Sequence, residues 1–305
     1  MLLYDSLFNL SSLHARFLRS AFLRRKIIFL QKSMNLIGYP APLLVGRSDV
    51  YVYADGVFLN TKFTDRYTKV IDGHLNEGYQ MGEYLKSVNV EPRSMLDIGA
   101  NCGEISLYFA KTFPECIVVA IEPSTENFNN LKSNLDFNIK MLGETTFKNL
   151  SLFQVAVSNN EEPVELTKYF RGENTIILDE SHMRYRVAAT ETVKSTTIDK
   201  IASSNGFKNV DFVKIDIEGA EPLLTEGLIK IKPKVILLEF SNKNKKEKYL
   251  DMFKKLINQG YKPSLVNDGH VANYDGKKID SLLEDLNNNR HWGTLFGGGD
   301  VWFVK

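Results

Sequence analysis

The sequence predicts an α/β fold in which a mostly parallel sheet carries helices on both faces. From about residue 76 onward, short apolar segments of strand length alternate with longer amphipathic segments. Strands separated by helices pair in parallel through right-handed crossovers, which place helices on both faces. The first such strand also ends in a glycine-containing turn at Gly99, as ligand-binding α/β sheets often do. A composition of 43% hydrophobic and 25% charged residues is ordinary for a globular protein.

Residues 1–75 are predicted to form an appendage to this domain. Apolar residues recur at roughly helical spacing in residues 1–35, where Asp5 is the only acid among six basic side chains. A Pro-interrupted turn and short strand-like pieces at 43–45 and 50–53 follow, and Gly46 and Asp55-Gly56 punctuate them and suggest a hairpin. The basic helix is expected to dock on the enzyme core or on a second copy of the chain; peripheral membrane contact is the less favoured alternative.

Residues 76–305 are predicted to form the main domain. Its seven predicted strands cover residues 94–98, 117–121, 150–157, 210–215, 235–240, 261–266 and 301–304. The last is short and suits an antiparallel position inside the sheet or at its edge. Helices are expected at 104–112, 124–137, 197–202, 220–230 and 245–259. Extended segments at about 160–195 break the alternation and are interpreted as a β-rich insertion near the ligand end of the sheet.

The turn after the first strand is the leading candidate for a cofactor site. It contains Asp97, Gly99, Ala100, Asn101 and Gly103. It lacks the second glycine of a dinucleotide-binding G-x-G-x-x-G motif and the Gly-Lys-Ser/Thr ending of a P-loop. A ligand without pyrophosphate therefore fits better. The ammonium and the carboxylate at the methionyl end of S-adenosylmethionine (SAM) suit Asp97 and the helix N-terminus.

Two later strand ends extend this candidate site. Glu122-Pro123 follows the second strand, close to the interval of about 20 residues after the glycine turn at which an acid reaches a ribose hydroxyl. Ala156 lies near the end of the third strand, beside the expected adenine position, although it could equally be part of an ordinary strand end. Glu77 precedes the first strand, where it could cover the cofactor.

A dense cluster of charges from Asp211 to Glu221 marks the catalytic side. With period 2, Lys214, Asp216 and Glu218 project from one side of the fourth strand. Asp216 is the first candidate for a general base, and it is also counted as a cofactor contact; Lys214 or Glu218 would orient it. His182 in the insertion is a lower-ranked base. A divalent metal held by Asp216 and Glu218 is a further alternative, but no other Asp/Asn pair at ligand spacing supports it, so no metal is assigned. The alternative to a catalytic role is that Lys214 and Asp216 form a structural ion pair.

These motifs together resemble the FkbM family of methyltransferases. The resemblance rests on Asp97-x-Gly-Ala-Asn-x-Gly, Glu122-Pro123, Thr197-Ile-Asp, Lys214-Ile-Asp-Ile-Glu-Gly-Ala-Glu221 and the closing Asp300-Val-Trp-Phe-Val. It covers residues 76–305. The resemblance implies a class I methyltransferase (Rossmann-like) fold with a seven-stranded sheet. It also implies SAM as cofactor and O-methylation of a sugar, a glycan or another small metabolite.

Two other function classes stay open. A nicotinamide-dependent oxidoreductase is disfavoured by the missing glycines, and a catalytically silent scaffold would keep the fold without the chemistry. A net charge of +1 and the absence of an Asp/Asn-Pro-Pro-aromatic loop argue against a nucleic-acid partner. Cys102 and Cys116 show neither disulfide nor zinc spacing, which predicts a cytoplasmic protein.

Overall fold

The computed structural model describes residues 51–54, 56–60, 77–169, 174–176, 187–241, 246–267, 270–274, 281–282, 286 and 298–305. The predicted N-terminal helix and His182 lie outside these residues. The chain divides into two compact units, Met1–Asn76 and Glu77–Lys305. In the first unit, β1 (Tyr51–Ala54) and β2 (Val57–Asn60) form an antiparallel hairpin with Ala54 opposite Val57. Gly56 has a φ of 84°, the backbone that a tight hairpin turn demands.

The second unit alternates helices and strands in the predicted way. Its first part contains α4 (Glu77–Ser87), β3 (Ser94–Ile98), α5 (Glu104–Thr112), β4 (Ile117–Ile121), α6 (Thr125–Leu142), η2 (Glu144–Phe147), β5 (Leu150–Phe153) and β6 (Ala156–Val157). The middle holds β7 (Val164–Tyr169), β8 (Asn174–Thr175), β9 (Val187–Val193), β10 (Ser195–Thr196) and α7 (Ile198–Ser204). The last part contains β11 (Phe212–Ile215), η4 (Glu221–Leu224), α8 (Thr225–Ile231), β12 (Val235–Ser241), α9 (Lys246–Asn258), β13 (Lys262–Asn267), β14 (His270–Asn273) and β15 (Gly298–Val304).

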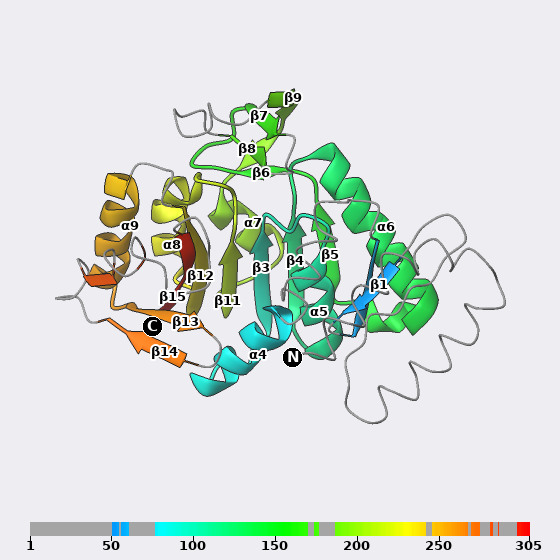
Figure 1. Cartoon of the computed structure of the whole chain (residues 1–305), viewed down its shortest axis with the longest axis horizontal. Helices are drawn as coiled ribbons and strands as arrows, with labels where there is room; N and C mark the ends of the chain where they lie inside the picture. The colour runs from blue at the N-terminus through cyan, green and yellow to red at the C-terminus, as the bar shows by residue number, and fades with distance from the viewer. Residues whose placement is uncertain are drawn as a thin grey trace, which may run out of the picture. The chain divides into compact units, whose positions relative to one another are not determined.

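Eight strands form the central sheet in the order β14-β13-β15-β12-β11-β3-β4-β5 (Figure 1). The five strands from β12 to β5 run parallel, and β15 lies antiparallel between β12 and β13. The predicted Rossmann-like class is confirmed. The sheet has one strand more than predicted, because β14 pairs with β13 as a hairpin. β4, the next strand of the sheet along the chain, lies on one side of β3, and β11, which comes much later in the chain, lies on its other side. This reversal is the place where open α/β sheets bind ligands.

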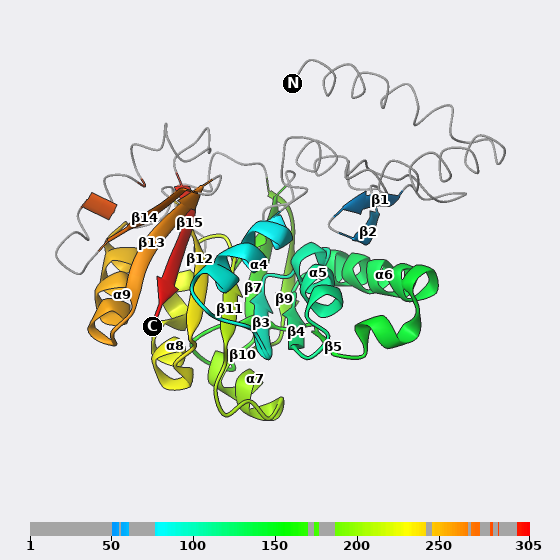
Figure 2. The ribbon, with the colours of Figure 1, turned by 90° about the horizontal axis from the view of Figure 1, so that it is seen from below.

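Helices cover both faces of the sheet, and alternation along the strands explains why. Val213 and Ile215 belong to the large apolar core that also contains Ile201 of α7, Leu228 of α8 and Met252 of α9. Phe212, the residue before Val213, lies on the opposite face, where its ring contacts Phe109 of α5 at a centroid distance of 5.5 Å. Figure 2 shows α4 and α7 on opposite sides of the sheet. All five residues of β3 are buried, as expected of a strand covered on both faces.

The stretch that interrupts the alternation forms a separate three-stranded sheet, β8-β7-β9, beyond the carboxyl ends of the parallel strands (Figure 1). The segment predicted as one strand at 150–157 divides into β5 of the central sheet and β6. The two residues of β6 pair in parallel with β10, so that Ala156 lies beside Ser195. The hydroxyl of Ser195 donates to the carbonyl oxygens of Asn160 and Glu162 at 3.0 and 2.6 Å. These contacts hold the two ends of the insertion next to each other.

Glu191 of β9 connects the insertion to the first turn of α6. Its carboxylate accepts hydrogen bonds from the backbone N–H and the hydroxyl of Thr125 and pairs with Lys168 of β7 at 2.6 Å. A carboxylate near a helix N-terminus also interacts favourably with the helix dipole. Within the described residues, no helix is both long enough and apolar enough to cross a membrane.

Candidate functional site

The glycine turn after β3 adopts a backbone that only glycine takes without strain at two positions. Gly99 has a φ of 80°, and a Cβ placed on it would lie 1.8 Å from the carbonyl oxygen of Asp216. Gly103 has a φ of 87°, and its Cβ would lie 2.1 Å from a methyl carbon of Leu131. The N–H groups of Gly99 and Ala100 both donate to the carbonyl of Ile121 at 3.0 Å. The turn is therefore tied to β4 and packed directly against the end of β11.

Glu122 follows β4 and lies against this turn, as the sequence predicted. One carboxylate oxygen accepts the N–H of Asn101 at 2.9 Å. The other accepts the N–H of Ser124 at 3.0 Å and the side-chain amide of Asn127 at 3.3 Å. These three bonds use both carboxylate oxygens to hold the backbone on either side of Glu122. Pro123, the residue after it, is half-buried. Glu122 therefore joins the glycine turn to the start of α6.

Two other predicted cofactor residues have mainly protein partners. Asp97 is 0% exposed; its Oδ2 accepts the hydroxyl of Ser106 at 2.5 Å, and its Oδ1 lies 3.6 Å from the Lys214 ammonium. Through these two partners, Asp97 connects the start of the glycine turn to α5 and to β11. Ala156 donates its backbone N–H to the carbonyl of Lys194 at 2.9 Å, so this residue offers no free donor for an adenine edge. The predicted ligand contacts of both residues stay predictions.

Lys214 connects the cofactor turn to the catalytic side. Its ammonium donates to the carbonyl oxygen of Gly99 at 3.3 Å and to Oδ2 of Asp216 at 3.2 Å. Burial disfavours its charge, but the negative charges of Asp216 and Asp97 outweigh burial and hold the pKa of Lys214 above its ordinary value. Glu77, the first residue of α4, adds a smaller contribution of the same sign. The ion pair that the sequence left as an alternative is present, and it lies within the candidate site.

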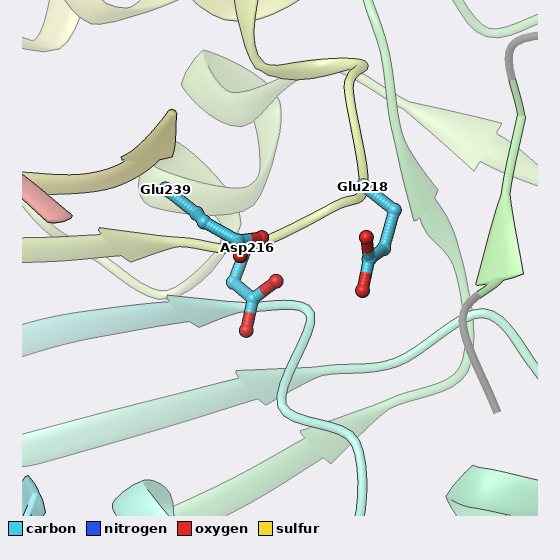
Figure 3. A group of neighbouring side chains, drawn as sticks. All are labelled: Asp216, Glu218 and Glu239. Atoms are coloured by element: carbon cyan, nitrogen blue, oxygen red, sulfur yellow. The ribbon is translucent and has the colours of Figure 1, made fainter. Parts of the chain in front are cut away.

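Three carboxylates gather beside Lys214 at the carboxyl ends of β11 and β12 (Figure 3). Asp216, Glu218 and Glu239 each place an oxygen within 4.8 Å of the other two, and all three are half-buried. Burial, together with the charges of Asp216 and Glu218, raises the pKa of Glu239 well above its ordinary value. Oxygen atoms grouped in this way can accept hydroxyl protons, and they are also the ligand type that hard divalent cations take.

The sequence did not identify Glu239, which lies inside the apolar segment Val-Ile-Leu-Leu-Glu-Phe of β12. A carboxylate in an otherwise apolar strand was the available signal, because burial of a charge is costly without a function or a partner. Its proximity to Asp216 depends on β11 and β12 being neighbours, which spacing along the chain does not give.

The loop that holds Asp216 and Glu218 is strained. The N–H of Asp216 still donates to the carbonyl of Ile98 at 3.0 Å, so this residue continues the pairing of β11 with β3. Glu218 then takes a φ of 53° and Gly219 a φ of 97°. Left-handed backbone costs a residue with a Cβ roughly 1–2 kcal/mol. Conformations of this kind concentrate at functional sites, where the surrounding structure maintains them.

The chain is similar in sequence to known methyltransferases. Residues 97–263 match the model of the methyltransferase FkbM domain. Methyltransferase sdnD of Sordaria araneosa is 23% identical over 160 residues, which cover 44% of this chain and 60% of that protein. Methyltransferase 1 of Beauveria bassiana is 21% identical over 150 residues, which cover 44% of this chain and 57% of that protein. The chain thus matches less than two thirds of either relative's length. The solved methyltransferase domain of a bacterial Hen1, CtHen1-C, is 14% identical, with a TM-score of 0.42 over 75% of this chain and 96% of that one.

Proposed function

The chain belongs to the FkbM methyltransferase family, and we propose that it transfers a methyl group from SAM to a hydroxyl group of a sugar, a glycan or another small metabolite. The observation that carries this proposal is the contact between Gly99 and Asp216. Through this contact the turn suited to the cofactor lies against the backbone of Asp216, one of the three residues whose carboxylates suit the acceptor. Lys214 bridges the two sides through the Gly99 carbonyl and the Asp216 carboxylate.

The residues at the turn fit SAM. Gly99 lets the turn pack against the Asp216 backbone, and the turn lies at the reversal of strand order beside β3, where open α/β sheets bind ligands. Glu122 lies against the turn through the Asn101 N–H and is the residue assigned to a ribose hydroxyl. When bound, SAM supplies an electrophilic methyl group on a sulfonium. Residues 99–103 and Glu122 would hold it.

The carboxylates of this chain would handle the acceptor and its proton. A hydroxyl oxygen that forms a bond to the methyl carbon must lose its proton, and Asp216 is the residue assigned to receive it. The Asp216 side chain is 42% exposed, so an acceptor can reach it, and Lys214 orients the carboxylate from the protein side. Glu218 and Glu239 would accept hydrogen bonds from neighbouring hydroxyls of the same acceptor.

Titration calorimetry with SAM, S-adenosylhomocysteine, NAD and NADP tests the cofactor assignment. We expect both SAM compounds to bind and both nicotinamides to fail. Binding of NAD without SAM would favour the oxidoreductase alternative and overturn the proposal.

A screen of sugars and other hydroxyl-bearing metabolites with methyl-labelled SAM tests the reaction. With an acceptor in hand, Asp216→Asn should lose transfer at saturating SAM by a factor of about 10²–10⁴, the range for removal of a general base. Asp251→Asn, a change at an exposed carboxylate of α9, is the matched control. Full activity of Asp216→Asn would show that the base is assigned wrongly. Binding of SAM without transfer to any acceptor in the screen would favour the scaffold alternative.

A further inference from the structure

A buried carboxylate and a buried phenol lie beneath the strained loop. Glu221, the first residue of η4, is 0% exposed, and Tyr249 of α9 is 1% exposed. One carboxylate oxygen of Glu221 accepts the backbone N–H of Ile217 at 3.0 Å, and the other accepts the hydroxyl of Tyr249. The N–H groups of Gly219 and of Glu221 itself lie close enough to this carboxylate to favour its charged form.

The donors are distributed so that a single carboxylate fixes the backbone around Glu218. Ile217 and Gly219 are its two neighbours: the N–H of Ile217 donates to Glu221, and the N–H of Gly219 lies near the same carboxylate. The loop between Asp216 and Glu221 is therefore held by a carboxylate at its own end. Since Glu218 and Gly219 both have positive φ values, this conformation needs such outside acceptors to persist.

We propose that Glu221 and Tyr249 are positioning residues that hold the loop bearing Asp216 and Glu218 in the conformation needed for methyl transfer. The proposal rests on the proposed function. Neither side chain is exposed enough to contact an acceptor, so both would act through the loop. Tyr249 connects the loop to the core, where its ring contacts those of Phe240 and Phe253 at centroid distances of 5.0 and 6.1 Å.

Another buried tyrosine provides a matched control. Tyr261 is 2% exposed and donates its hydroxyl to the carbonyl of Pro233 at 2.6 Å, with no bond to the loop. Tyr249→Phe and Tyr261→Phe each remove one buried hydroxyl and keep the ring. A purely structural role for Tyr249 predicts the same behaviour for both variants, whereas a positioning role predicts different effects on the loop.

The experiment compares the full-length wild type, Tyr249→Phe, Tyr261→Phe and Glu221→Gln. The measurements are thermal unfolding, the amide NMR signals of Ile217 and Gly219, and SAM affinity by calorimetry. With an acceptor found by the labelled-SAM screen, kcat and the KM for SAM are added. We expect Tyr249→Phe to shift both amide signals, to leave SAM affinity within about threefold, and to lower kcat at least tenfold at constant KM for SAM. Tyr261→Phe should lower the melting temperature without any of these effects.

Unshifted Ile217 and Gly219 signals in Tyr249→Phe would overturn the proposal, as would equal losses of kcat in the two tyrosine variants. If Glu221→Gln does not fold, Tyr249→Phe alone decides. If the wild type does not bind SAM, the proposed function fails. The amide signals then still show whether the pair holds the loop.

Discussion

Substitution of Gly99 by alanine tests whether the glycine turn and the end of β11 need to be in direct contact. The new Cβ would lie 1.8 Å from the Asp216 carbonyl oxygen and 2.8 Å from its carbonyl carbon. Both atoms are backbone and cannot rotate away, so the turn and the loop must separate. Gly206 is the matched control, because its φ of 73° is also left-handed but nothing lies within 4 Å of its Cβ position.

The difference between the two variants isolates the clash. Left-handed backbone costs alanine roughly 1–2 kcal/mol at either position. Overpacking at Gly99 adds about 1–3 kcal/mol. At roughly 2–4 °C per kcal/mol, Gly99→Ala should melt about 2–12 °C below Gly206→Ala. Because the separation occurs at the cofactor turn, SAM affinity should fall at least tenfold in Gly99→Ala and stay unchanged in Gly206→Ala.

Urea and thermal unfolding measure the stability difference, and calorimetric titration measures the affinity. Equal stability losses in the two variants would show that the contact between Gly99 and Asp216 is not tight in solution. A larger stability loss in Gly99→Ala with undiminished SAM affinity would keep the packing argument and refute the assignment of this turn as the cofactor site.

Three further predictions follow from charges and burial. Lys214→Met leaves the fully buried Asp97 without its cation and should lower the free energy of unfolding by about 3–5 kcal/mol. Lys230 is an exposed lysine, so the control Lys230→Met should change the free energy of unfolding by less than about 1 kcal/mol. Urea titration measures both variants. Asp211 is partly buried, which opposes its charge, but its bonds to Lys234 and to two backbone N–H groups outweigh this and lower its pKa below the ordinary 3.8. Its stabilisation is therefore complete above pH 3.8 and lost as the pH falls through the folded pKa. The melting temperatures of wild type and Asp211→Asn should converge in that acidic range, and a constant difference down to pH 2 would contradict the assignment. Burial raises the pKa of the Cys116 thiol to about 12, with a smaller contribution from the Asp211 charge. Iodoacetamide at pH 8 should label Cys116 only after unfolding, as peptide mass mapping would show, and rapid labelling of the native protein would refute this.

Strands and helices with strong local signals were predicted closely. The bounds of β3, α5 and β4 match the predicted ranges, because each is a run of apolar or amphipathic residues with a clear turn on either side. β15 was correctly predicted as antiparallel and lies inside the sheet, but it begins at Gly298, three residues before the predicted range. β14 was missed because His270–Asn273 contains only two apolar residues. The preceding Asp-Gly in the sequence was an available hairpin signal.

The sequence predicted the candidate site where residues follow a strand end directly, and failed where partners come from other elements. The turn at Gly99 and the approach of Glu122 to it follow from the order of β3 and β4. The role of Glu239 needs the pairing of β11 with β12, and that of Tyr249 needs the packing of α9 beneath η4. Spacing along the chain encodes neither of these contacts.

The way the insertion joins the domain has a consequence for how this family can diversify. Its two ends meet where β6 pairs with β10, so the segment between them leaves and re-enters the domain at one point. The entropy of closing such a segment grows only slowly with its length. Evolution could therefore lengthen, shorten or exchange this segment without moving the turn at Gly99 or the carboxylates near Asp216. The insertion and the residues around Gly99 and Asp216 could then change at different rates, and the same joint offers a place to graft the insertion of one relative onto another.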